Sequence, residues 1–158
     1  MVAKVISEAI QNLRVEKDIF IAAPLEIAFE SLLEQLGPEN EVVGGKAMPM
    51  VLEPWPGGRW YRDLGKHNFG GHGGHFWGHV QVIKPPALIE ISGPLFMSYP
   101  GVNHLQYRLT AEGTGTRLHL LHRGFGEIPA EHRDGVNEGW AHMLAIVQRL
   151  AEAKAQAK

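Results

Sequence analysis

Apolar residues recur at helical intervals in two stretches of the chain. The first stretch begins at Pro24, a residue suited to the first turn of a helix, and ends where Gly37 and Pro38 interrupt the pattern. In the second stretch, apolar side chains return every three or four positions from Val136 to Ala151, with charged residues on the opposite side. These patterns predict a short helix near the N-terminal end and a long helix close to the C-terminus.

Between the two helices, apolar and polar residues alternate instead, which is typical of half-buried strands. Short alternating runs fill residues 49–125 and are separated by turn sequences such as PGG, KPPA and EGTG. A further alternating run precedes the first helix, with Leu13, Val15, Ile19 and Ile21 on one face. The predicted order of elements is therefore strand, helix, several strands and helix.

This order predicts an α+β fold in which a curved antiparallel sheet of about six to seven strands grips a long C-terminal helix. A strongly twisted sheet is concave on one face, and a single helix laid across it leaves a pocket between them. We expect a single domain over residues 14–155. Residues 1–13 carry apolar groups at helical spacing and are predicted to form a helical extension. This extension would pack on the domain or on a second copy, so a homodimer is one of two arrangements to test.

The composition restricts the partners that this domain can have. The chain has 158 residues, a formal charge of −2 and no cysteine. It therefore lacks the basic field that attracts a nucleic-acid backbone, and disulfides and thiolate metal sites are excluded. The longest uncharged run, residues 91–107, is interrupted by glycine and proline, and the N-terminus has no apolar signal-peptide core. We expect a cytoplasmic protein with no membrane span and no nucleic-acid partner.

A stretch rich in histidine and glycine, HNFGGHGGHFWGH at residues 67–79, is the most conspicuous candidate for a metal site. Zinc needs three or four ligands that converge at about 2 Å. On a strand, His75 and His79 share a face but lie about 13 Å apart, too far for one ion. His72 and His75 remain a pair, although ordering the glycines between them costs entropy. We predict no specific metal and no other cofactor, and we interpret the stretch as a flexible hairpin tip over the mouth of the pocket.

Alternation places several side chains of the later strands on the inner face of the sheet. Leu118, Leu120 and His122 share one face of a strand, and Tyr107 points inward from a neighbouring strand. A histidine in this position either hydrogen-bonds a ligand or moves a proton, or it is a core residue satisfied by a backbone carbonyl or water. For catalysis we favour the core interpretation, while expecting His122 to line the pocket.

The predicted pocket is lined by side chains from the strands, one loop and the final helix. The predicted ligand-binding residues are Trp60, Phe76, Val80, Phe96, Tyr107, Leu120, His122, Trp140 and Leu144. For each aromatic residue, plain packing in the core explains the position equally well. The sequence has no nucleophile-elbow serine, phosphate-binding loop or dinucleotide fingerprint. The lack of these motifs favours a binding protein over an enzyme.

Four stretches, in this order along the chain, carry a family resemblance: IAAPLEIAFESL, PWPGGRWYRD, GHVQVIKPPALIEI and GTRLHLLHRGFG, the last followed by GWAHML. They are similar to the START-like, helix-grip superfamily (SRPBCC), and in particular to its AHSA-type branch of bacterial proteins related to the heat-shock-protein ATPase activator. The resemblance runs from Val15 to Ala151 and implies a hydrophobic cavity between the sheet and the C-terminal helix. The chain departs from the pattern between RWYRD and WGHV, where the connection is longer and rich in histidine and glycine.

The resemblance leaves three functions open, because the superfamily includes lipid carriers, plant-hormone receptors and polyketide cyclases. The first is binding or carriage of a small hydrophobic or aromatic molecule, oriented by His122 and Tyr107. The second is an enzyme of the cyclase or dehydratase type that uses His122 as a general acid or base. The third is an interaction module similar to the chaperone-activating relatives. The lack of enzyme motifs favours the first.

Overall fold

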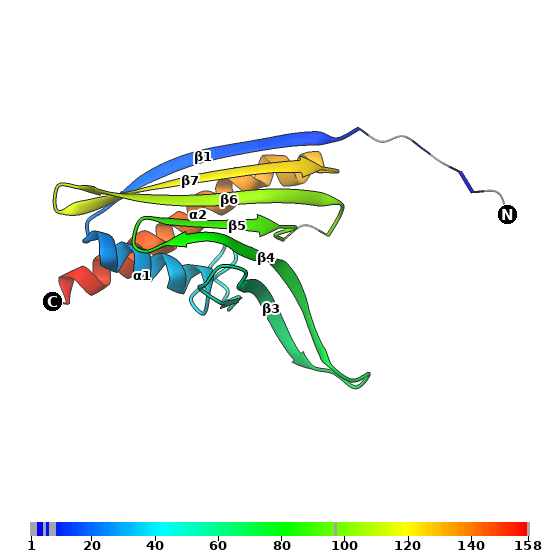
Figure 1. Ribbon diagram of the computed structural model, residues 1–158, viewed down its shortest axis with the longest axis horizontal. Helices are drawn as coiled ribbons and strands as arrows, with labels where there is room; N and C mark the ends of the chain where they lie inside the picture. Colours follow the sequence, from blue (N-terminus) through cyan, green and yellow to red (C-terminus); the bar gives the residue numbers. More distant parts are fainter. Residues whose placement is uncertain (1–2, 5, 7–8, 97, 158) are drawn as a thin grey trace.

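The computed structural model describes residues 3–4, 6, 9–96 and 98–157 (Figure 1). Within these residues, one antiparallel sheet of seven strands in the order β1-β7-β6-β5-β4-β3-β2 packs against two helices. The predicted α+β fold with a long C-terminal helix is confirmed. The elements are β1 (Gln11–Ile21), α1 (Leu25–Leu36), β2 (Val51–Leu52), β3 (Arg59–Lys66), β4 (His72–Lys84), β5 (Leu88–Gly93), β6 (Gly101–Glu112), β7 (Gly115–Gly126) and α2 (Ala130–Gln156).

The core lies between the sheet and the helices, which occupy the same face of the sheet and pack against each other (Figure 1). In β6 and β7 buried and less buried residues alternate, so that Leu105 and Leu120 face the core together with their neighbours two positions away. The apolar stripe of α2 meets them with Trp140, Leu144 and Val147. Within the described part of the chain, no helix is both long and apolar enough to cross a membrane.

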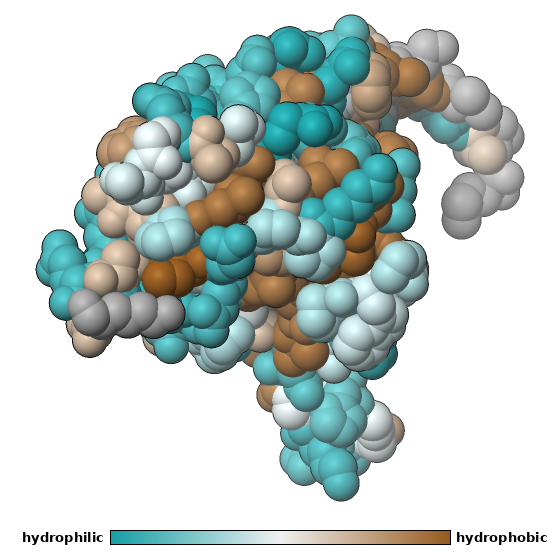
Figure 2. Space-filling model, turned by 60° about the vertical axis from the view of Figure 1, so that its left-hand side comes forward, coloured by the Kyte–Doolittle hydropathy of each residue, from teal (hydrophilic) through white to brown (hydrophobic). Residues whose placement is uncertain are grey.

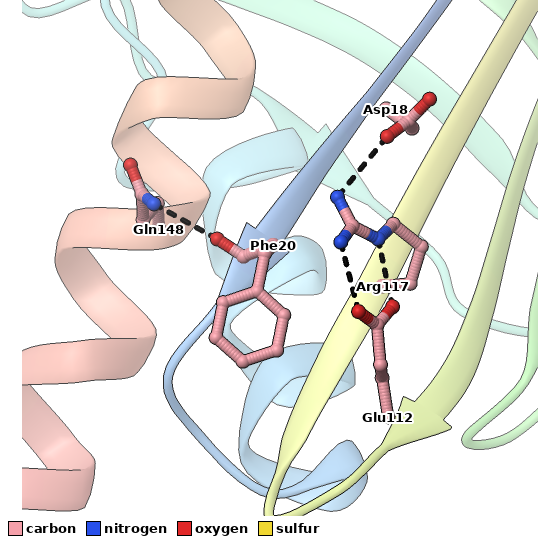
Figure 3. Close-up of polar contacts among 5 residues, drawn as sticks. All are labelled: Asp18, Phe20, Glu112, Arg117 and Gln148. Carbon is pink, nitrogen blue, oxygen red and sulfur yellow. Dashed lines mark hydrogen bonds and ion pairs between the residues drawn. The ribbon is translucent and has the colours of Figure 1, made fainter.

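Side chains of α2 hold this helix to the edge strand β1 by satisfying main-chain groups. Nε2 of Gln148 donates a 2.9 Å hydrogen bond to the carbonyl oxygen of Phe20 (Figure 3). One turn further along α2, Oε1 of Glu152 accepts a 3.0 Å hydrogen bond from the main-chain N–H of Ala22. These contacts fix the C-terminal half of α2 beside the end of β1.

Arg117 of β7 joins three adjacent strands at the same end of the sheet. Its guanidinium lies 3.1 Å from a carboxylate oxygen of Asp18 in β1 and 2.8 Å from one of Glu112 in β6 (Figure 3). The guanidinium also lies over the ring of Phe20, 5.6 Å from its centroid. The hydrogen bonds from Arg117 hold the pKa of the Glu112 carboxyl below its usual value. Because these groups are exposed, the ion pairs of the cluster contribute little to stability.

Two bulges in β4 break the alternation that the sequence suggests. Trp60 pairs with Gly78 and Tyr61 with Phe76, so Trp77 has no partner in β3, and a second shift lies between the pairs of Val80 and Val82. An extra residue in one strand reverses which side chains face the core. Strict alternation predicts Phe76 inside and Trp77 outside, and this prediction is wrong. Trp77 is 5% exposed, whereas Phe76 is 41% exposed.

The predicted helical extension over residues 1–13 is wrong at its C-terminal end. Residues 11–13 belong to β1 and pair with residues 124–126 of β7. The physical reason is that the alternating pattern of β1 already begins there and adds ladder hydrogen bonds to β7. Ala9 and Ile10 have no regular secondary structure, and residues 1–2, 5 and 7–8 lie outside the described residues.

Candidate ligand-binding cavity

A cavity of about 320 Å³ lies between the sheet and the two helices. The sheet contributes Trp60 from β3, Trp77 from β4 and Tyr107 from β6, and the β5–β6 connection contributes Phe96. One wall comes from the first half of α2, and another from the end of α1 and the loop after it. The lining residues of these walls are Gln35, Leu36, Asn40, Val42, Val43, His132, Gly135, Val136, Gly139, Trp140 and Met143.

Four aromatic rings pack edge to face around the cavity. The ring centroids of Trp60 and Trp77 are 4.9 Å apart, those of Trp77 and Phe96 are 5.6 Å apart, and those of Phe96 and Trp140 are 6.1 Å apart. Each indole N–H is used within the protein: Nε1 of Trp60 donates to the carbonyl oxygen of Leu36 at 2.6 Å, near the end of α1. The rings therefore offer the cavity apolar surface.

Tyr107 places a polar group in this apolar surrounding. The side chain lines the cavity and the residue is 1% exposed, and among the described residues its hydroxyl has no hydrogen-bond partner. Burial raises the pKa of the Tyr107 hydroxyl, so the group keeps its proton at neutral pH. A buried hydroxyl without a partner is costly, and a ligand in the cavity can supply the missing hydrogen bond.

Gln35 is a second buried polar residue in the lining, and its amide has a defined orientation. Nδ2 of Asn40 donates to the carbonyl oxygen of Met48 at 3.0 Å, so Oδ1 of Asn40 is the atom that accepts from Nε2 of Gln35, also at 3.0 Å. The same Nε2 lies 3.1 Å from Sδ of Met143. Gln35 is 2% exposed, and within the described residues Oε1 has no hydrogen-bond partner. The atom left unpaired is therefore a carbonyl-type acceptor.

His122 lies behind Trp140 and is not among the lining residues. The residue is fully buried, and its Nδ1 accepts a 3.0 Å hydrogen bond from Nε1 of Trp140. The neutral ring therefore carries its proton on Nε2, which donates to Oδ1 of Asn103 at 2.8 Å. Burial, with a smaller contribution from the charge of His132, lowers the pKa of His122 to about 4. Both ring nitrogens are thus used by protein groups.

His132 and Phe96 lie at the more open part of the cavity. Their rings are stacked, with centroids 4.9 Å apart and planes at 26°. Burial lowers the pKa of His132, and its Nε2 has no hydrogen-bond partner among the described residues. Phe96 is partly exposed, and Val43 in the opposite loop is more exposed still. These residues mark the side from which a molecule can enter.

The structure brings some of the predicted site residues together and separates others. Four of them line the cavity: Trp60, Phe96, Tyr107 and Trp140. Val80, Leu120 and Leu144 are buried in the core outside the lining, as is His122. Phe76 lies on the other face of the sheet, where its ring is 4.8 Å from that of His79.

Sequence reasoning missed several lining residues, among them Trp77, Gln35 and Met143. Trp77 faces the cavity because of a bulge, which leaves no mark in the hydrophobic pattern. Gly135 and Gly139 could have been found from the sequence. Two glycines one turn apart weaken a helix, so their presence indicates a role other than helix formation. Both line the cavity, and a Cβ at either would meet no atom within 4 Å.

Apart from Trp77, which lines the cavity, the histidine-rich stretch lies outside it. It forms the outer part of the β3–β4 hairpin, which projects from the sheet as an arm (Figure 1), and none of residues 62–76 lines the cavity. The prediction that it covers the pocket mouth is wrong, because β4 pairs with β5 only from His79 onwards and its first residues continue past the sheet with β3 alone. Figure 2 shows the arm mainly in teal and white, while brown residues gather on the body above it.

The histidines of the arm have protein partners instead of a shared centre. Nδ1 of His72 lies 3.2 Å from Oδ1 of Asp63, and Nδ1 of His75 accepts a 2.7 Å hydrogen bond from Nε1 of Trp77. In the part of the chain that the structure describes, no three His, Asp or Glu side chains are grouped in a way that could hold a metal ion.

The sequence profile of a family described as Activator of Hsp90 ATPase homolog 1-like protein matches residues 32–152. No functionally curated protein matches the sequence at a significant level.

Solved structures share the fold at low sequence identity. A putative uncharacterized protein from Rhizobium leguminosarum is 16% identical with a TM-score of 0.68, over 92% of this chain and 97% of that one. The di-domain ARO/CYC StfQ from the steffimycin biosynthetic pathway is 14% identical with a TM-score of 0.64, over 92% of this chain and 51% of StfQ. Ara h 8.0201 is 10% identical with a TM-score of 0.66, over 90% of this chain and 99% of that one. At these identities the likeness concerns the fold alone.

Proposed function

Because the chain belongs to the family of Activator of Hsp90 ATPase homolog 1-like proteins, within the helix-grip superfamily, we propose that its cavity binds a small, mainly apolar molecule. The resemblance drawn from the four sequence motifs is confirmed by this membership. The observation that carries the proposal is a hollow lined by aromatic rings in which two deeply buried polar groups lack a partner among the described residues. Apolar walls with a few polar groups are typical of small-molecule sites.

The size of the cavity sets the size of the molecule. An apolar cavity of about 150 Å³ in another protein holds one benzene ring. The cavity here, about 320 Å³, therefore suits a molecule of roughly two fused rings. Each Å² of apolar surface removed from water contributes about 25 cal/mol, so the rings of the ligand supply most of the affinity.

The geometry of the cavity supports ligand binding more than it supports acid–base catalysis by His122. A general acid or base must reach the proton that it transfers, directly or through one water. His122 is separated from the cavity by Trp140, and its two ring nitrogens already bond Trp140 and Asn103. In this proposal His122 positions the indole of Trp140, and Tyr107 contacts the ligand.

The test uses prodan, an uncharged naphthalene dye whose fluorescence shifts to the blue in apolar surroundings. We expect saturable 1:1 binding to the full chain, together with any retained organic molecule in native mass spectra of the purified protein. Gly139→Leu places a side chain in open cavity space and should weaken binding by about tenfold or more. Asn137→Leu, at an exposed position of the same helix, is the matched control and should bind as the parent does. Equal binding by both variants, or no saturable binding, would contradict the proposal.

A further inference from the structure

The cavity contains no charged side chain that could accompany a charged ligand. None of its lining residues is Lys, Arg, Asp or Glu. The one titratable ring at the mouth, His132, is kept neutral by burial, which lowers its pKa. Moving an anion out of water into such a site costs far more than moving a neutral molecule of the same shape. The lining therefore favours an uncharged ligand.

Besides Nε2 of His132 at the open side of the cavity, two unpaired polar groups lie deeper in the lining, and they differ in the hydrogen bonds that they can make with a ligand. Oε1 of Gln35 can only accept, because the chain of hydrogen bonds through Asn40 to the carbonyl of Met48 fixes which end of the amide is free. The hydroxyl of Tyr107 keeps its proton and can both donate and accept. A molecule that fills the cavity leaves both groups without access to water, so a ligand without a donor leaves Oε1 of Gln35 buried and unsatisfied.

We propose that the cavity selects an uncharged molecule of about two fused rings that carries a hydroxyl or N–H donor, with Oε1 of Gln35 as the acceptor for that donor and the hydroxyl of Tyr107 as the second polar contact. This inference rests on the proposed function, since it names the ligand class of the same cavity. Sites built to bond a donor reject analogues that lack it more strongly than apolar pockets reject a change in size.

The test compares naphthalene derivatives of nearly equal size by calorimetry on the full chain at pH 7. 2-Naphthol carries a donor, 2-methoxynaphthalene only an acceptor, 2-naphthoate a negative charge and 2-naphthylmethylammonium a positive charge. We expect 2-naphthol to bind about tenfold more tightly than 2-methoxynaphthalene, and both ions to bind more weakly than 2-naphthol.

Two variants test whether Gln35 and Tyr107 cause the preference for 2-naphthol. Gln35→Met removes the acceptor while keeping the length of the side chain, and should reduce the preference for 2-naphthol over 2-methoxynaphthalene to within about twofold. Tyr107→Phe removes a hydroxyl that has no partner among the described residues, so this variant should fold. Its affinity for 2-naphthol should be about fivefold lower than that of the unaltered protein. If Gln35→Met does not fold, because Asn40 loses its donor, the unaltered protein and Tyr107→Phe still decide the question.

The outcomes separate this inference from the proposed function. Equal binding of 2-naphthol and 2-methoxynaphthalene, or tighter binding of either ion, would overturn the ligand class while the binding function stands. Failure of all four probes and of prodan to bind would overturn the proposed function and the inference together. A preference for 2-naphthol that persists unchanged in both variants would overturn the roles of Gln35 and Tyr107.

Discussion

Nε1 of Trp140 donates a 3.0 Å hydrogen bond to Nδ1 of His122, and this bond fixes both rings where the final helix crosses the sheet. Trp140 faces the cavity on one side and His122 on the other, with ring centroids 5.4 Å apart and planes at 77°. Because Nδ1 must accept, the bond requires a neutral imidazole. The wall of the cavity therefore depends on a histidine that is not itself part of the lining.

The first prediction concerns stability in acid. The pKa of His122 is lowered to about 4 in the folded protein, from an ordinary value of about 6.5 in the unfolded chain. Between these values the unfolded chain binds more protons, so stability is complete above pH 6.5 and falls as the pH drops towards 4. Relative to pH 8, His122 alone should lower the free energy of unfolding by about 2 kcal/mol at pH 5. Urea titrations at each pH measure this loss.

Two variants test whether His122 causes the loss. His122→Gln should be less stable at pH 8, because the Nδ1 atom that accepts from Trp140 is removed, but its stability should depend less on pH between 5 and 8. His132→Gln should remove a smaller part of the pH dependence, since His132 is only partly buried. An unchanged pH dependence in His122→Gln would show that the imidazole is not held neutral.

How far the sequence predicts this site depends on the element. Tyr107 and Trp140 were predicted to face inward from the alternation of a strand and the stripe of a helix, and both line the cavity. These elements are regular, so periodicity alone gives the direction of their side chains. Trp77 could not be found in this way, because a bulge is set by how β4 fits between β3 and β5 and not by the pattern of one strand.

Gln35 shows a second limit of sequence reasoning. It follows Leu32 by three positions and therefore lies beside the apolar stripe of α1, yet a glutamine there is normally exposed. Its burial depends on Asn40, which receives its amide hydrogen, and on the loop that positions Asn40. The sequence does not predict these hydrogen bonds, because they form only when the loop is folded against the helix.

The second prediction concerns the loop after α1, whose residues Val42 and Val43 line the cavity. The loop is tied to α2 through Glu41, whose Oε2 accepts a 3.1 Å hydrogen bond from Arg149. A partly exposed ion pair contributes up to about 1 kcal/mol, so Glu41→Gln should speed the release of prodan by up to about fivefold. Stopped-flow fluorescence measures the rate.

Matched substitutions separate the loop contact from a general change of charge. Arg149→Gln removes the other partner and should speed release to a similar extent. Glu39→Gln, at an exposed position close by, should leave the rate unchanged. If all three variants release prodan at the same rate as the parent protein, the loop does not control access to the cavity.

The third prediction concerns Gly135, which sits in α2 and also lines the cavity. Since no atom lies within 4 Å of an added Cβ, Gly135→Ala should gain helix propensity without a clash. We expect the free energy of unfolding to rise by about 0.5–1 kcal/mol, seen in calorimetry as a Tm about 1–4 °C higher. Gly113→Ala is the contrast: it also has open space, but its φ of +60° strains any side chain, so its Tm should fall.

The same variant tests whether Gly135 leaves room for a ligand at the rim of the cavity. The new methyl group of Gly135→Ala occupies the rim of the cavity, so the rise in Tm produced by saturating 2-naphthol should be smaller than in the parent. A stability gain combined with weaker ligand stabilisation would assign Gly135 to the cavity and not to the folding of α2. If Gly135→Ala instead lowers the Tm without ligand, the space beside this turn of the helix is not open in solution.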